Sequence, residues 1–569
     1  MGELARRRAN WARWILVLIG AAGVSAAAAC GGDDDKKPRG SAGNAGTAGR
    51  GGAGGNAGSA GSSGSAGSDA AAGTGGGAGS PADSGTDADA GPLSTYVDCV
   101  NGLDTNNGFE ATPFKTLAKA ASVATSGMTI WVLNGVCDRN TEPTFNEVNG
   151  DVDIPAGVSL RAKNPGQVTF SGLTGYRSAG IRFLGSGAVQ GIRFQTFGRA
   201  ISAASGTLNV TGVTFDDIYQ GSPLELSGTA QATLSPGGVT NYIGTDQRTF
   251  AQLSDTARLT VLGGAIRGAK DSGISGQGMF LVTEQSELVL DGVTLENNQH
   301  SGVVVVGSAR AIVRNNTIIR STASVACCSQ SSIRVGQTGR LELLDSTITA
   351  APVSAIVLTA GTPNVLLRNA TVTSSAGYAI FGAIYSDALP TIRIENSRLT
   401  DNHGGVYSNY ATTLDISDSE ISRNGSPSIG CAQGISLNPA VINNVMLRNT
   451  QVVGNCSAGI IVGGSAGSAF DLGRGNSPGG NTFTGNSSPG NLGNLRIELG
   501  AGGTVYASGN TWEPGVQSAA PAGSTDPLPG RYKVTTGTAL NVTGAQAGRN
   551  YVIIGASAAS TTLRLAENP

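Results

Sequence analysis

From Val189 onward the chain repeats a short pattern of apolar and polar positions. Each copy reads apolar, any residue, then Gly, Asn or Asp, then two further residues and a second apolar residue, and successive copies are 21 to 31 residues apart. The central position is held by Gly191, Gly212, Gly263, Gly292, Asn315, Asp345, Asn369, Asn396, Asp418 and Asn449, with weaker copies at Pro236, Gly480 and Gly509.

The central position of this repeat predicts a bend. Gly, Asn and Asp tolerate a left-handed backbone better than other residues do, and the flanking residues alternate between apolar and polar as in short strands. A strand, a bend and a strand in every repeat predict an all-β chain, a right-handed parallel β-helix of about a dozen rungs. Missing helical segments argue against a leucine-rich repeat, and a propeller needs longer, antiparallel blades.

A second column of residues fixes the register of the predicted coil. Six residues after each bend stand Asn298, Ser321, Ala351, Ser375, Asn402, Asn424, Asn455 and Asn486. Asn therefore falls above Asn on the last four rungs, and stacked side-chain amides can hydrogen-bond along such a stack. We interpret this column as structural and not catalytic.

The open ends of the coil need covering. Residues 112–124 predict a short amphipathic helix, with Thr112 as its cap, Pro113 at its first position and Phe114, Leu117 and Ala121 on one face. We expect this helix, within an N-terminal cap unit at 93–140, to cover the start of a β-helix at 141–530. Residues 531–569 are expected to form a C-terminal, strand-rich cap.

The first thirty residues predict export. Arg6, Arg7 and Arg8 precede an apolar run, and the small residues before Cys30 resemble a lipoprotein signal peptide over 1–30. Cys30 would then be lipidated and anchor the protein to the membrane of the cell envelope, with the outer membrane as the expected location. An ordinary secretory signal cleaved near the same place is the alternative.

The amino-acid composition predicts which segment is disordered and which partners are unfavourable. Residues 31–92 are rich in Gly, Ala and Ser and lack large apolar side chains, so we expect a disordered tether. The whole chain has 87 Gly, 13% charged residues and a net charge of −2. This balance gives no basic surface for phosphates and argues against a nucleic-acid partner. We expect a monomer without a cofactor.

Six cysteines follow Cys30, and an exported protein can form disulfides. Cys99 and Cys137 lie in the N-terminal cap unit and are the preferred pair. Cys431 and Cys456 are about one repeat apart, which would place them on neighbouring rungs. Cys327 and Cys328 are adjacent, and either a vicinal bridge or two thiols is compatible with the sequence. No Cys-x-x-Cys motif and no acidic cluster supports a metal site.

The candidate catalytic residues are four charged side chains on neighbouring rungs. The repeat aligns Arg398 with Glu420 and Asp401 with Arg423. An acid, a base and a cation on one face are what sugar chemistry needs. Cross-strand ion pairs are the simpler interpretation, and we favour it.

The two histidines do not form a common site. His403 lies near the four charged residues, but His300 is four rungs away, roughly 19 Å at strand spacing, which is too far for one metal ion or proton relay. Each histidine is therefore expected to be a surface turn residue.

The N-terminal unit resembles a known family. Tyr96-Val97-Asp98, Gly102-Leu103-Asp104, Asn107-Gly108, Thr112 to Leu117 and Trp131 to Gly135 resemble the domain-of-unknown-function 1565 family, within the pectin-lyase-like β-helix group. The resemblance implies a β-helix and makes carbohydrate the leading ligand class. Because the sequence offers few candidate catalytic groups, it favours a non-catalytic carbohydrate-binding or adhesion scaffold. A polysaccharide lyase, epimerase or hydrolase is the alternative.

Overall fold

The structure is a computed structural model in which the chain divides into two units, residues 1–90 and 91–569. It describes residues 94–566 except for 147–149, 174–177, 217–220, 236–238, 242–248, 268–277, 299–300, 321–330, 383–389, 429, 439, 466, 475, 487–494, 500–503, 507–508, 513–529, 535–538, 544–551 and 555–561. Cys30, the predicted signal peptide and the predicted tether therefore lie outside the described residues.

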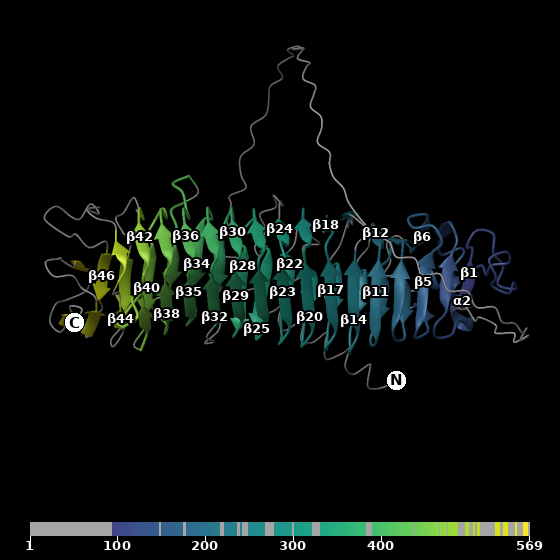
Figure 1. Cartoon of the computed structure of the whole chain (residues 1–569), viewed down its shortest axis with the longest axis horizontal. Helices are drawn as coiled ribbons and strands as arrows, with labels where there is room; N and C mark the ends of the chain where they lie inside the picture. Colours follow the sequence, from purple (N-terminus) through teal and green to yellow (C-terminus); the bar gives the residue numbers. More distant parts are fainter. Residues whose placement is uncertain are drawn as a thin grey trace, which may run out of the picture. The chain divides into compact units, whose positions relative to one another are not determined.

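The described chain winds through three faces of parallel strands, and Figure 1 shows neighbouring turns side by side in chain order. Sheet 1 has 18 strands: β1 (Ser94–Val97), β2 (Thr129–Val132), β5 (Val158–Ala162), β8 (Gly187–Gln190), β11 (Thr207–Thr211), β14 (Gln231–Ser235), β17 (Arg258–Leu262), β20 (Glu287–Asp291), β23 (Arg310–Arg314), β26 (Arg340–Leu344), β29 (Asn364–Arg368), β32 (Thr391–Glu395), β35 (Thr413–Ser417), β38 (Asn444–Arg448), β41 (Ala469–Asp471), β44 (Thr504–Tyr506), β47 (Ala539–Thr543) and β49 (Thr562–Ala566).

Sheet 2 has 16 strands: β4 (Val152–Ile154), β7 (Ala179–Phe183), β10 (Arg199–Ala203), β13 (Leu224–Leu226), β16 (Ala251–Leu253), β19 (Gly278–Val282), β22 (Ser301–Val305), β25 (Ile333–Gln337), β28 (Ile356–Gly361), β31 (Tyr378–Gly382), β34 (Gly404–Ser408), β37 (Ile435–Leu437), β40 (Ile460–Gly464), β43 (Leu495–Leu499), β46 (Gly530–Val534) and β48 (Val552–Ile554).

Sheet 3 has 11 strands: β15 (Val239–Asn241), β18 (Ala265–Arg267), β21 (Thr294–Glu296), β24 (Ile318–Arg320), β27 (Thr347–Thr349), β30 (Thr371–Thr373), β33 (Arg398–Thr400), β36 (Glu420–Ser422), β39 (Gln451–Val453), β42 (Thr482–Thr484) and β45 (Thr511–Trp512). A further four-stranded sheet contains β3 (Gly135–Cys137), β6 (Val168–Ser171), β9 (Ile192–Gln195) and β12 (Thr214–Asp216).

These sheets confirm the predicted parallel β-helix. The predicted number of rungs, about a dozen, is close to the 11 strands of sheet 3. Sheets 1 and 2 are larger for two reasons. The coil also takes in segments before the first bend and after the last one, and the strands after the first two bends, β9 and β12, belong to the four-stranded sheet. Within each strand alternate side chains point inward, as in β32, where Ile392 and Ile394 are fully buried and Arg393 between them is exposed.

The predicted bends have the expected backbone. The bend residues from Gly191 to Asn449 have positive φ, and so do Gly480 and Gly509 of the weaker copies. Asn369, for example, has φ 51°, and its side-chain amide donates to Asp345 Oδ1 on the preceding turn at 2.9 Å. The bend column therefore combines left-handed geometry with hydrogen bonds between turns. Pro236 lies outside the described residues.

The second column forms the predicted amide ladder. The backbone N–H of Ser375 donates to Asn402 Oδ1, that of Asn402 to Asn424 Oδ1, and that of Asn424 to Asn455 Oδ1, at 3.0 to 3.1 Å. The ladder continues to Asn486 Oδ1 at 3.0 Å. These residues are buried, so their hydrogen bonds lie inside the coil. Ser321 lies outside the described residues.

A further ladder occupies the position directly after the bend, and the sequence pattern did not reveal it. The N–H of Ala370 donates to Ser397 Oγ and that of Ser397 to Ser419 Oγ, both at 3.0 Å. On the turn after Ser419, Thr450 N–H donates to Asn481 Oδ1 at 2.9 Å. Ser, Thr and Asn can all supply the accepting oxygen, so this column has no single residue type to recognise.

The capping helix is shorter than predicted and begins later. Helix α2 spans Leu117–Val123, and its cap is Thr116, whose side chain accepts from Lys119 N. Thr112 is not the cap, because residues Phe109 and Thr112 form a β-bridge and Phe114 bridges to Val97. A short 3-10 helix, η1 (Pro143–Asn146), follows β3.

Two carboxylates hold the start of α2. Asp104 accepts from the N–H of Lys115 and Thr116 at 3.0 and 2.9 Å, and Glu142 accepts from Ala118 N at 3.1 Å. Leu117, Ala120 and Ala121 are buried in the core, and α2 packs against β1 and β4, the first strands of sheets 1 and 2. The helix thus covers the first turn of the coil (Figure 1).

The described strands of the predicted C-terminal cap, β46 to β49, extend sheets 1 and 2 in parallel register. In the described part of the chain no helix is both long and apolar enough to cross a membrane.

Disulfides join Cys99 to Cys137 and Cys431 to Cys456. Cys327 and Cys328 fall outside the described residues.

Candidate functional site

The four candidate residues lie on sheet 3 and at the corner that follows it. Arg398 and Glu420 are direct partners in the pairing of β33 with β36. Asp401 and Arg423 come directly after these strands and have positive φ, 59° and 52°. Each precedes a ladder asparagine, Asn402 or Asn424, whose side chain points into the coil.

This corner is part of a second left-handed column, which lies five residues after most of the bends. Among the described residues it comprises Thr196, Asn297, Ala350, Ser374, Asp401, Arg423, Gly454 and Gly485. Six of the eight are not glycine, and this is why no bend signal marked the column in the sequence.

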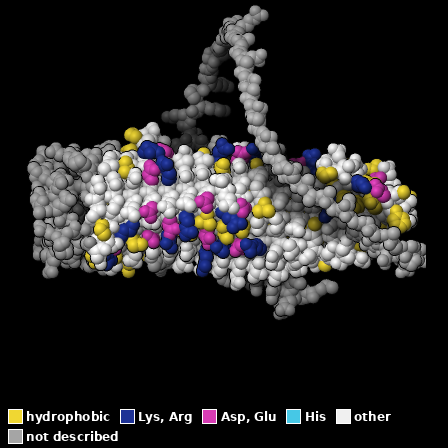
Figure 2. Space-filling model, in the orientation of Figure 1, with side chains coloured by type: hydrophobic (Ala, Val, Ile, Leu, Met, Phe, Trp, Pro, Cys, Tyr) yellow, Lys and Arg dark blue, Asp and Glu magenta, His cyan; other side chains and the backbone are white. Residues whose placement is uncertain are grey.

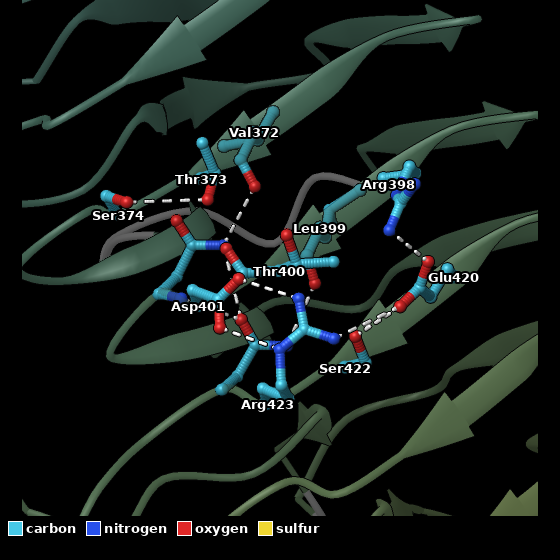
Figure 3. A network of polar contacts seen from close by, with 12 residues as sticks. Val372, Thr373, Ser374, Arg398, Leu399, Thr400, Asp401, Glu420, Ser422 and Arg423 are labelled. Atoms are coloured by element: carbon cyan, nitrogen blue, oxygen red, sulfur yellow. Dashed lines mark hydrogen bonds and ion pairs between the residues drawn. The ribbon is translucent and has the colours of Figure 1, made fainter.

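The candidate residues form two ion pairs across neighbouring turns, as Figure 3 shows. Arg398 Nη2 lies 2.9 Å from Glu420 Oε2. Arg423 donates from both Nε and Nη2 to Asp401, each at 2.8 Å. Arg423 Nη1 is also 3.6 Å from Glu420 Oε1, and Ser422 donates to that oxygen at 2.6 Å. The cross-turn alignment predicted from the repeat is therefore present.

The geometry gives this cluster the properties of a surface ion-pair ladder. The side chains of Arg398, Arg423 and Asp401 are 59%, 54% and 46% exposed. The hydrogen bond from Arg423 holds the pKa of the Asp401 carboxyl below its ordinary value, so this group stays ionised at neutral pH. A general acid needs the opposite shift. This arrangement favours the structural interpretation of the four residues.

The same kind of pair recurs elsewhere on the coil. On sheet 1, Arg368 pairs with Glu395 at 2.7 Å and Arg448 with Asp471 at 2.8 Å. Figure 2 shows this alternation as side chains of opposite charge lying next to one another on the visible face. Ion pairing between turns is therefore a general feature of this surface.

Aromatic side chains gather on the outer face of sheet 2 beside this corner. The rings of Phe381 and Tyr407 are 5.3 Å apart between centroids and nearly parallel, at 11°. Tyr378 stacks against Phe381 with 5.7 Å between centroids. The His403 ring meets Tyr378 edge-on at 5.8 Å. We call these four residues the aromatic group.

The aromatic group is half-buried, so part of each ring reaches solvent. Burial raises the pKa of the Tyr378 hydroxyl, and Tyr407 donates its hydroxyl proton to Asn409 Oδ1 at 2.7 Å. Gly404 lies beneath the Tyr378 ring, where a Cβ atom would approach a ring carbon to 2.3 Å. From the sequence, His403 was expected only as a surface turn residue, and its aromatic neighbours were missed. An aromatic residue at an outward position on two consecutive turns is the signal that could have revealed them.

His300 lies outside the described residues, so the structure does not add to the distance argument against a shared histidine site. In the described part of the chain no cluster of His, Cys, Asp and Glu side chains could hold a metal ion.

A model of the family described as "Right handed beta helix region" matches residues 200–386 and 328–486, which together make up half of the chain. The protein therefore belongs to the right-handed β-helix family. No curated protein matches the sequence.

Several solved structures resemble the chain distantly. The mannuronan C-5 epimerase AlgE6 A-module of Azotobacter vinelandii has 14% identity and a TM-score of 0.33, covering 70% of this chain and 93% of its own. The Dettilon tailspike protein has 13% identity and a TM-score of 0.31, covering 71% and 68%. A mannuronic acid specific polysaccharide family 6 lyase from human gut microbiota has 11% identity and a TM-score of 0.26, covering 76% and 87%. At these values the likenesses carry no argument about activity.

Proposed function

We propose that this protein is a non-catalytic carbohydrate-binding or adhesion scaffold of the cell envelope. Lipidated Cys30 would anchor it, most simply at the outer membrane, and residues 31–92 would tether the coil. The coil would then present its outer faces to glycans or neighbouring surface polymers.

The observation that carries the proposal is the aromatic group on the outer face of sheet 2. Aromatic side chains offer large apolar surfaces, and tyrosine adds a polar end that can remain in water. Sugar rings present C–H groups on their faces and hydroxyls around their edges. Partly exposed rings of Tyr378, Phe381 and Tyr407 among polar side chains suit both parts of such a ligand.

The proposal that the protein does not convert its ligand rests on the carboxylates beside the aromatic group. Asp401 and Glu420 are each engaged by arginines. An acid–base pair for glycoside cleavage needs one carboxyl group that is protonated at the working pH. With Asp401 held ionised, this corner supplies binding and orientation more readily than proton transfer.

The test is a glycan array probed with the full chain in detergent. We expect binding to a subset of glycans, and Tyr407→Leu should weaken it by about tenfold, the effect of losing one well-packed aromatic contact. The matched control is Asn364→Ala, an exposed change on sheet 1, which should bind like the native protein. No binding to any glycan, or equal binding by Tyr407→Leu, would refute the proposal.

A further inference from the structure

Arg334 stands in line with the aromatic group on sheet 2. The register of the strands aligns Val304 with Arg334, Arg334 with Val357, Val357 with Phe381, and Phe381 with Tyr407. The neighbours of Arg334 in β25, Ile333 and Val335, are fully buried, so the arginine side chain lies on the outer face.

Arg334 differs from the paired arginines of the coil. Its side chain makes no hydrogen bond or ion pair with any described residue, although it is only partly exposed. Arg182 stands at an equivalent outward position of sheet 2 and donates to both oxygens of Asp153, at 2.7 and 2.8 Å. In the described part of the chain, Arg334 therefore has a guanidinium group without a counter-charge.

A partly buried, unpaired charge is unfavourable. Burial lowers the pKa of Arg334, but a guanidinium remains protonated at neutral pH. The side chain thus loses part of its hydration without gaining an ion pair, and a bound anion would offset that cost. Arginine presents parallel N–H groups that match the two oxygens of a carboxylate or a sulfate ester.

We propose that Arg334, Phe381 and Tyr407 form a subsite for an anionic glycan, in which Arg334 binds a carboxylate or sulfate ester and the rings contact adjoining sugars. This inference rests on the proposed function and adds the charge class of the ligand. The ligand would lie along the coil axis, crossing the strands β25, β28, β31 and β34.

The spacing of the strands suits such a ligand. Arg334 and Phe381 are two strands apart, or about 10 Å, and Tyr407 adds about 5 Å more. This span has the scale of a short oligosaccharide. Val357, which stands between Arg334 and Phe381, leaves a small apolar side chain between the charged and aromatic ends.

The choice of an anionic ligand follows from charge complementarity. A neutral glycan could use the aromatic rings but would leave Arg334 unpaired. An apolar partner would bury the guanidinium further and increase the cost. An anionic glycan can use both parts of the site: its charged group pairs with Arg334, and its sugar rings contact Phe381 and Tyr407.

The decisive comparison uses the native full chain and pairs of ligands that differ only in charge. Oligogalacturonate is compared with its methyl ester, and dextran sulfate with dextran, by calorimetry at low salt. We expect the charged member of at least one pair to bind about tenfold or more tightly, which is the effect of one charge-assisted hydrogen bond. The first pair tests a carboxylate and the second a sulfate ester.

Three variants assign the effect to Arg334. Arg334→Gln should remove the preference for the charged ligand, and Arg334→Lys should retain only part of it because lysine lacks the paired N–H groups. Arg340→Gln is the matched control, since it removes the same charge from an exposed position on sheet 1 and should leave binding unchanged.

The outcomes separate this inference from the proposed function. Equal affinity for charged and neutral members of both pairs, or an unaltered preference in a folded Arg334→Gln variant, overturns the anionic subsite while leaving glycan binding intact. No binding of any of the four ligands or of the glycan array overturns both. The ligand pairs decide the question even if Arg334→Gln does not fold, because they use the native chain.

Discussion

Asn424 donates twice to one atom of the following turn: its backbone N–H and its side-chain amide both reach Asn455 Oδ1, at 3.1 and 2.9 Å. The same amide also donates to the carbonyl of Leu399 at 3.0 Å. On the other side, Asn424 Oδ1 accepts from the backbone of Asn402 at 3.1 Å. One fully buried side chain therefore satisfies polar groups on the turns both before and after it.

The ladder should be sensitive to the loss of one amide. Asn424→Ala leaves the N–H of Asn402 and the carbonyl of Leu399 without these partners, and we expect the free energy of unfolding to fall by about 2 to 4 kcal/mol. Chemical denaturation followed by circular dichroism measures the change. Asn209→Ala, an exposed asparagine of β11, should cost little. Equal effects of the two substitutions would contradict a stabilising role for the ladder.

The bend column makes a prediction about residue type. Asn369→Val places a β-branched side chain at φ 51° and should cost on the order of 1 to 2 kcal/mol, whereas Asn369→Gly should be tolerated. The same comparison applies to Asn449, whose φ is 49°. Thermal unfolding of the four variants measures the difference. If Val were tolerated as well as Gly at both positions, the left-handed requirement would be wrong.

The pair of Asp401 and Arg423 predicts a small dependence of stability on pH. Arg423 lowers the pKa of the Asp401 carboxyl from its ordinary 3.8. A carboxyl with a lowered pKa stabilises the folded state above its unfolded pKa and loses that contribution as the pH falls through its folded pKa. Because both side chains are about half exposed, the contribution is about 0 to 1 kcal/mol.

Asp401→Asn tests this contribution without adding backbone strain, since asparagine also tolerates the left-handed corner. The native protein should be slightly more stable than Asp401→Asn at neutral pH, and the two should converge as the pH falls through the lowered pKa of the Asp401 carboxyl. Melting temperatures measured from neutral to acidic pH report the difference. A gap that stays constant with pH would show that the ion pair is not its source.

Export and anchoring depend on Cys30. Cys30→Ala should release the protein from membranes or leave it unprocessed, because the site of lipid attachment is lost. Membrane fractionation and metabolic labelling with a fatty acid measure this. Retained lipid labelling with unchanged fractionation would disprove the lipoprotein proposal.

Most of the coil could be predicted from sequence because its bends demand rare backbone geometry. Gly, Asn and Asp recur where φ must be positive, and the buried amides recur where Asn402, Asn424 and Asn455 accept from neighbouring turns. The start of α2 could not be placed in the same way. Thr112 and Thr116 are both suitable caps, and the choice depends on contacts of Asp104 and Glu142 that arise only in the folded chain.

The candidate site was predicted only in part. Alignment of the repeat brought Arg398 to Glu420 and Asp401 to Arg423, since the pairing of charges depends on register alone. The aromatic group and Arg334 were missed because their strands lie between the corner and the next bend, across loops of unequal length. The spacing from the bend therefore does not align Phe381 with Tyr407.

The central claim is that the coil binds glycans without converting them, and a product assay on the charged corner tests it most directly. The native full chain, Arg398→Ala and Glu420→Ala are incubated with acidic and neutral polysaccharides, with and without calcium, while unsaturated products and reducing ends are followed. We expect binding without product in all three proteins, and a loss of stability of about 0 to 1 kcal/mol in each variant. Product formed by the native protein that falls by about a hundredfold or more in Glu420→Ala would identify a catalytic acid and contradict this account.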